Sequence, residues 1–265
     1  MYLYLLLFRF SDILYKLTKT HFYIARKNLV DNAINLYIWA FCSLIVMGYI
    51  MQEYGLANDY GCFQLATVIG TIGLFQIYGN SFRFIADIEG DQHINYLLTL
   101  PLNPTVVLWS FICSYALIGI ILTLFMIPFG KLLLWNSFSL ATISWLKFAI
   151  ILILSNVFFG VFTIAVTAHV GAMSKMENVW TRFIFPLWFM GGYMFSWELV
   201  YNLSQPLAYV FLGNPILFVM EGTRAALLGQ ADCLPWEICC AALCGFTLVG
   251  WWYAQYKMKR LLDFV

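Results

Sequence analysis

One short polar segment, residues 83–104, gathers several side chains that could do chemistry between two long apolar runs. Four of its first nine residues are charged, namely Arg83, Asp87, Glu89 and Asp91, whereas only 10% of the whole chain is charged. Charges that lie outside the lipid orient a soluble partner by complementarity more than they add raw affinity. The segment is therefore the predicted contact for such a partner.

The same segment predicts a short helix from about residue 92 to residue 99. Asp91 would be its N-cap, because a carboxylate can accept hydrogen bonds from the first free backbone amides. Pro101 prevents the helix from continuing. Three apolar residues at helical spacing would form one face: Ile94, Leu97 and Leu98. Taken alone, the pattern fits either a rigid lever moved by a partner or a solvated loop.

A second group of polar residues interrupts the apolar stretch 197–230. Glu221 and Arg224 are three residues apart, which is within ion-pair reach on a helix. Asn214 and Pro215 indicate a turn, because proline forces the preceding residue out of helical geometry. Broken backbone at membrane depth requires cover from protein or a wet cavity, so we expect a re-entrant pair of short helices in the outer leaflet. A structural role and a role in an outer gate both stay open for these four residues.

The sequence contains no motif for metal binding, catalysis or ATP binding. The three histidines, His21, His93 and His169, have no partner at metal-ligand spacing, and no catalytic cluster is present. Gly130-Lys131 lacks the glycine run of a GxxxxGK[ST] phosphate loop, so we expect no ATP site in this chain. The seven cysteines fall mostly in apolar runs and are expected to pack as small apolar residues.

The aromatic residues Trp188, Tyr193 and Phe195 are a candidate lining for a substrate path. An aromatic belt at the membrane surface explains them equally well.

These residues must be positioned by helices in a membrane. The chain of 265 residues is 63% hydrophobic, more than a soluble domain of this size buries. A helical span needs about 20 apolar residues. We expect one membrane domain, residues 1–265, with six transmembrane helices, at about 33–51, 61–82, 106–129, 148–170, 183–197 and 236–256.

The positive residues predict the topology. Lys and Arg gather near both termini and in the loops after the second and fourth expected spans. Both termini and these loops are therefore expected to be cytoplasmic. Residues 1–32 combine basic side chains with apolar ones at helical spacing, which predicts an amphipathic helix in the membrane interface. No secretory signal peptide is expected. A net charge of +1 gives no argument for a nucleic-acid partner.

Two segments resemble a known family. Residues 78–108 contain YGNSFRF, an acidic turn and YLLTLPLNP, and residues 182–230 contain WFMGGYMFSWELV and GNPILFVMEGTRAALLG. Both resemble the membrane subunits of ABC exporters of the type II export permease family, and among them the permeases for polysaccharides, lipo-oligosaccharides and drugs.

The resemblance implies a permease without catalytic activity in the bacterial inner membrane. Such a permease pairs with itself as a homodimer and with two copies of an ABC ATPase that holds ATP and magnesium. Its substrate would be amphipathic: a lipid, a lipid-linked glycan or a drug. The polar segment, residues 83–104, would then be the coupling segment. Two other classes stay open: an intramembrane lipid-modifying enzyme, and a passive channel or scaffold.

Overall fold

The computed structural model describes residues 2–57, 59–229 and 233–262, and the side chains from Ser11 to Leu261 within those ranges. Every regular element in these ranges is helical, and none is a strand. The predicted all-α class is confirmed. Met1, Gln230 and the C-terminal end of the predicted permease domain lie outside the described residues.

Five helical runs of the described chain are long and apolar enough to cross a membrane. Four are single helices or nearly so: α4 (Tyr60–Ala86), α6 (Pro104–Leu133), α7 (Trp145–Val170) and α13 (Trp236–Leu262). The fifth joins the end of α1 (Tyr2–Ala25) to α2 (Leu29–Ile45) and α3 (Met51–Glu53). Each contains one of the expected spans and extends beyond it.

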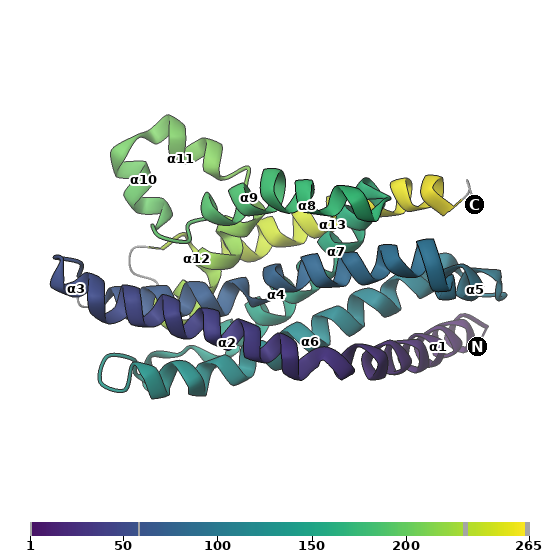
Figure 1. The fold of residues 1–265 in the computed structure, drawn as a ribbon, viewed down its shortest axis with the longest axis horizontal. Helices are drawn as coiled ribbons and strands as arrows, with labels where there is room; N and C mark the ends of the chain where they lie inside the picture. Colours follow the sequence, from purple (N-terminus) through teal and green to yellow (C-terminus); the bar gives the residue numbers. More distant parts are fainter. Residues whose placement is uncertain (1, 58, 230–232, 263–265) are drawn as a thin grey trace.

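The long helices run along one direction, and both termini lie at the same end of the bundle as the short helix α5 (His93–Thr99) (Figure 1). The opposite end carries α3, α10 (Trp197–Leu203) and α11 (Gln205–Phe211). The most apolar stretch of α4 is 83% buried, against 22% for that of α13. Helix α4 is therefore central, whereas α13 leaves most of its surface free for lipid.

Close packing of α6 against α7 depends on two glycines. A Cβ atom at Gly119 would lie 2.0 Å from the Asn156 Oδ1 atom, and one at Gly160 would lie 3.0 Å from the backbone oxygen of Ile112. Small residues at these positions allow the two backbones to approach, which is how helices associate in lipid.

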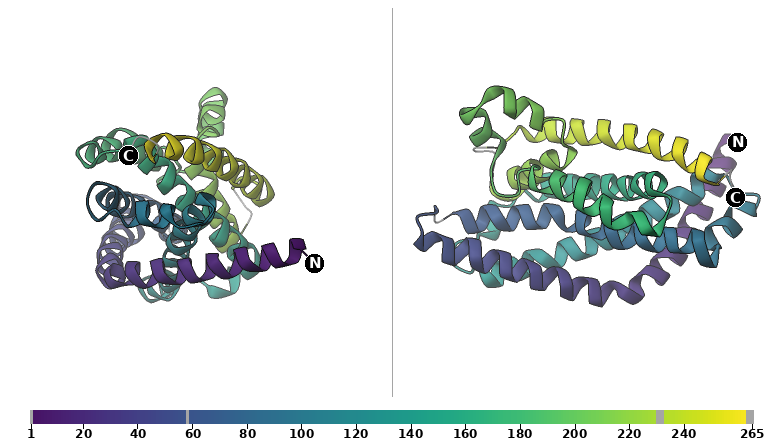
Figure 2. Two further views of the ribbon diagram at one scale, coloured as in Figure 1. Left: turned by 90° about the vertical axis from the view of Figure 1, so that its right-hand side faces the viewer. Right: turned by 45° about the horizontal axis from the view of Figure 1, so that its top comes forward.

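The chain bends between α1 and α2, at the 3-10 turn Arg26–Asn28. Figure 2 shows the N-terminal helix crossing the end of the bundle at a steep angle to the other helices. Helix α1 packs against α6. The predicted interfacial segment, residues 1–32, thus corresponds to α1, the turn and the first residues of α2.

The expected span at 183–197 is not one continuous helix. A helical run from Met176 through α8 (Met176–Val179) ends with α9 (Phe185–Phe189). Its 14 residues reach about 21 Å, short of the roughly 30 Å hydrocarbon core. Gly192 then adopts φ +88, a backbone conformation that favours glycine. The run of fifteen uncharged residues, 183–197, predicts a span, but the chain turns at Gly191 and Gly192 and ends the helix early.

Three helices, rather than a pair, follow that turn: α10, α11 and α12 (Pro215–Leu227). Helix α12 is buried from Ile216 to Leu227 and packs against α4, α7 and α13. The predicted break before Pro215 is confirmed, because residues 212–214 turn the chain between α11 and α12. The prediction missed that α12 lies in the centre of the bundle.

Candidate functional site

The short helix of the polar segment is present, but its cap differs from the prediction. Gln92 adopts φ 52, which separates α5 from the π-helical turn η3 (Asp87–Asp91). This reversal places the start of α5 against the side chain of Asp87, whose Oδ2 atom accepts a 2.8 Å hydrogen bond from the Ile94 amide. The predicted Asp91 cap is therefore wrong, because Asp91 is exposed at the end of the turn.

The apolar face of α5 packs against its own chain. Ile94 is 1% exposed and Leu97 is 5% exposed, in a cluster with Phe84 and Val107. Leu98 is half-buried and packs on the same cluster, while Pro101 is exposed. Ile94 and Leu97 thus hold α5 to α4 and α6, and their side chains are not available at the surface. The surface of the segment is formed by other residues, among them Asp91, Gln92, Tyr96 and Thr99.

Tyr96 is the residue of this segment that the sequence prediction missed. Tyr96 is 61% exposed, on the side of α5 away from the buried Ile94 and Leu97. The helical spacing could have predicted this exposure, because Tyr96 lies between Ile94 and Leu97 in the sequence and is not part of the apolar face that they form. Exposed aromatic residues such as this tyrosine are enriched in contact surfaces between proteins.

Glu89 connects the polar segment to another loop at the same end. Its Oε1 atom accepts a 3.1 Å hydrogen bond from the Met173 amide, just after α7. The spacing of 84 residues between them gave no sequence signal for this contact.

A cavity of about 330 Å³ separates the polar segment from α1. Arg83, Asp87 and Asp91 line it from one side, and His21 lines it from α1. The His21 Nδ1 atom lies 3.0 Å from the Ser110 Oγ atom, so α1 is also tied to α6. The sequence placed His21 only in a membrane interface and missed this packing. Among the described residues, no group of three or more His, Cys, Asp or Glu could hold a metal ion.

Glu221 and Arg224 form the expected ion pair, and both side chains are fully buried. The Nη1 atom of Arg224 lies 2.8 Å from the Glu221 Oε1 atom. A charge this deep costs several kcal/mol unless it is paired and hydrogen-bonded. Figure 1 places α12, which carries both residues, behind the outer helices.

Further partners satisfy both charged groups. Arg224 donates to the Thr67 hydroxyl through Nε (3.0 Å) and Nη2 (2.7 Å), and it also contacts the Gly192 carbonyl. Glu221 accepts bonds from the backbone amides of Trp197 and Leu234. The pair thus fastens α12 to α4 and to the loops on both sides of α10–α12. Thr67 escaped the sequence analysis because a threonine in an apolar helix carries no spacing signal.

Asn214 and Pro215 begin α12. The Asn214 Oδ1 atom accepts a 3.0 Å bond from the Ile216 amide, while its Nδ2 atom donates to the Leu187 carbonyl at 2.7 Å. Pro215 occupies the first turn, where its missing amide costs nothing. These contacts support the predicted turn at Asn214 and Pro215, which lies between α11 and α12.

The candidate path residues separate into two groups. Trp188 and Tyr193 pack together with ring centroids 4.3 Å apart, and Trp39 and Phe75 complete their cluster. Phe195 instead packs on Phe211 of α11. The Tyr193 hydroxyl lies 2.7 Å from the Ser43 Oγ atom. The cluster therefore fills the space between α2, α4 and the turn after α9.

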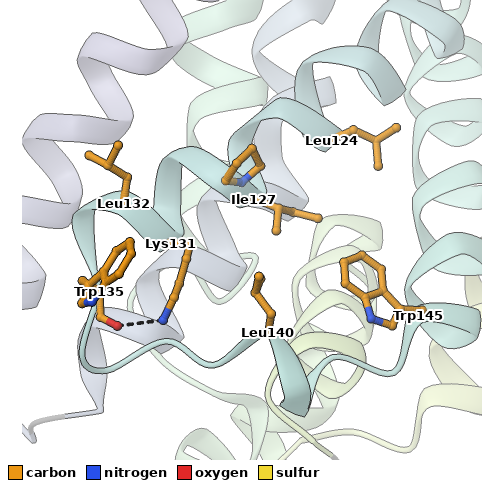
Figure 3. A pocket seen from close by; sticks show the side chains of 8 residues that line it. Leu124, Ile127, Lys131, Leu132, Trp135, Leu140 and Trp145 are labelled. Carbon is orange, nitrogen blue, oxygen red and sulfur yellow. Dashed lines mark hydrogen bonds between the residues drawn. The ribbon is translucent and has the colours of Figure 1, made fainter.

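An apolar cavity of about 440 Å³ at the end of α6 contains one cation, Lys131 (Figure 3). Its amino group donates to the backbone oxygens of Trp135 (2.7 Å) and Phe138 (2.5 Å). Figure 3 shows the Lys131 side chain turned to the Trp135 carbonyl. The cation satisfies the free carbonyls after a helix C-terminus, so it is not available to a ligand.

The fold defines a class: an all-helical protein, in its described residues, with five helices long and apolar enough to cross a membrane. No family model and no curated protein matches the chain.

Proposed function

We propose that this chain is the membrane-spanning permease subunit of an ATP-driven ABC exporter. It moves an amphipathic substrate across the plasma membrane, works as a homodimer, and receives motion from a separate ATPase. Both termini and the polar segment 83–104 face the cytoplasm. The helical run 176–189 and helix α12 together provide the sixth crossing as two broken helices.

One observation carries this proposal: a short helix is fixed at the end of two long helices and has an exposed polar tip. Asp87 caps α5, and Ile94 and Leu97 anchor it to the bundle. A push on the exposed face, at Asp91 or Tyr96, is therefore transmitted to α4 and α6 without first deforming the segment. A solvated loop would need neither the buried anchors nor the cap.

The contact between Glu89 and the Met173 amide adds a second route. It joins the polar segment to the start of the broken crossing, so a movement of α5 also reaches α8 and α9. Through Arg224 and the Gly192 carbonyl, the turn after α9 is joined to α12. These contacts form a continuous packed connection from the tip of α5 to the centre of the bundle.

Two alternatives have their own tests. An intramembrane lipid-modifying enzyme would turn over a lipid with the purified chain alone, without ATP. A passive channel would conduct ions in a planar bilayer with no partner. The Ser110 hydroxyl lies 3.0 Å from the His21 Nδ1 atom, but it donates to the Val107 carbonyl at 2.6 Å, so this pair does not present an activated nucleophile that would favour the enzyme.

The experiment that tests the proposal is purification of the tagged chain from native membranes in mild detergent. We expect a co-purifying subunit with a GxxxxGK[ST] sequence, whose ATP hydrolysis drives substrate movement after reconstitution. Asp91→Lys should release or uncouple that subunit. Glu53→Lys, an exposed acid at the opposite end of the bundle, should leave it unchanged. A normal complex and full transport with Asp91→Lys would contradict the coupling assignment.

A further inference from the structure

A cavity of about 850 Å³ opens between α7, α13 and the helical run 176–189. Its walls are mainly apolar or aromatic, as at Phe158, Phe162, Phe246 and Trp252. Trp252 is 68% exposed, so this wall continues onto the outer surface of α13. In a membrane-spanning chain such a wall faces lipid.

The cavity has a length suited to one leaflet. Its α7 wall runs from Phe158 to Val170, thirteen residues of helix that cover about 18 Å. Half of the hydrocarbon core is about 15 Å thick. The cavity therefore extends from the end of the bundle that carries both termini to near its middle, as one acyl chain does.

The charged side chains that line the cavity are all positive. Lys175 and Arg182 line it, no Asp or Glu does, and both cations are exposed. Neither cation takes part in an ion pair in the described part of the chain. His169 and Tyr253 add polar atoms, with the His169 Nδ1 atom 2.7 Å from the Tyr253 hydroxyl.

Arg182 is the less usual of the two cations. The helical run carries it seven residues beyond Lys175, about 10 Å further from the end of the bundle. A guanidinium beside an apolar wall at that depth is costly without an anion, and it extends along the surface toward polar groups. Together with Lys175 it presents donors suited to phosphate oxygens, for which Arg has the matching geometry.

We propose that this cavity binds one lipid with an anionic phosphate headgroup. Lys175 and Arg182 hold the phosphate, and an acyl chain lies along α7 toward Phe158 and Phe246. This inference rests on the proposed function for the orientation of the chain, and it narrows the amphipathic substrate to lipids with an anionic phosphate headgroup.

Native mass spectrometry of the full chain in detergent tests the proposal without an ATPase. The probes are phosphatidylglycerol and phosphatidylcholine, added separately. We expect one tightly retained phosphatidylglycerol per chain, bound about tenfold more strongly than phosphatidylcholine. The phosphate of phosphatidylcholine is already neutralised by its own choline cation, so it gains less from Lys175 and Arg182. Soluble glycerol phosphate should not compete, because it lacks the chain that fills the apolar wall.

Two variants identify the site. Lys175→Gln with Arg182→Gln should abolish the preference for phosphatidylglycerol. Lys19→Gln with Lys27→Gln removes the same net charge from exposed positions of the N-terminal helical region and should preserve it. Gly250→Leu should lower retention of both lipids, because Gly250 lines the cavity and an added Cβ meets Val161 only at 3.4 Å. Size-exclusion elution at the native volume confirms that each variant is folded.

Equal retention of both lipids by the native chain, or an unchanged preference in the Lys175/Arg182 variant, would overturn the proposal. Retention of neither lipid by the native chain would also overturn it. None of these outcomes bears on the contact between α5 and an ATPase, which the co-purification experiment tests separately.

Discussion

The Asp87 carboxylate accepts a 2.8 Å hydrogen bond from the Ile94 amide, across the left-handed residue Gln92. We expect Asp87→Ala to destabilise helical α5 by about 1 kcal/mol, the usual effect of losing an N-cap. Hydrogen exchange of the amides of residues 94–97 should accelerate. Asp91→Ala is the matched control and should leave this exchange unchanged. Equal acceleration in both variants would contradict the assignment of Asp87 as the cap.

The buried pair predicts a non-additive double mutant. Arg224→Met leaves Glu221 charged and unpaired, and Glu221→Gln leaves Arg224 charged and unpaired. Each variant should lower the free energy of unfolding by about 3–5 kcal/mol. The double variant should recover most of that loss, because no buried charge remains. Thermal unfolding in detergent measures all three. Additive losses would show that the two residues act independently.

Glu89 should stabilise the start of the broken crossing. Glu89→Ala removes the acceptor for the Met173 amide, and we expect faster hydrogen exchange over residues 172–176 by a few-fold, since one partly exposed bond contributes about 1 kcal/mol. Glu89→Gln keeps a carbonyl acceptor and should restore slow exchange. Failure of the glutamine to restore it would indicate that charge, and not the hydrogen bond, orders this loop.

Tyr193 should contribute to stability through its hydroxyl as well as its ring. Tyr193→Phe breaks the 2.7 Å contact with the Ser43 hydroxyl, to which Gln64 also donates. A loss of about 1 kcal/mol in the free energy of unfolding is expected. Tyr209→Phe, at a tyrosine that is 59% exposed, should change stability little. Equal losses in the two variants would argue against a packed role for the Tyr193 cluster.

The sequence predicted the elements whose signal is local. Helices α4, α6, α7 and α13 follow from runs of apolar residues longer than a bilayer is thick. The short helix α5 follows from the spacing of Ile94 and Leu97 and from Pro101. The pair of Glu221 and Arg224 follows from their spacing on one helix.

The sequence failed where position depends on the rest of the chain. It assigned the cap to Asp91, the nearest acid, because the left-handed Gln92 has no signature of its own. It predicted one span at 183–197, because an apolar run does not reveal that Gly192 turns the chain. Thr67 and Met173 escaped notice because their partners are distant in the sequence.

The central claim is that the exposed face of α5 meets an ATPase, and crosslinking from Tyr96 tests it most directly. A photoreactive amino acid replaces Tyr96, which is 61% exposed, or Tyr54, which is 82% exposed and directly follows α3 at the opposite end of the bundle. In native membranes, light should join the Tyr96 variant to a subunit with a GxxxxGK[ST] sequence, and the Tyr54 variant should not form this product. Crosslinks from both positions, or from neither, would contradict the claim.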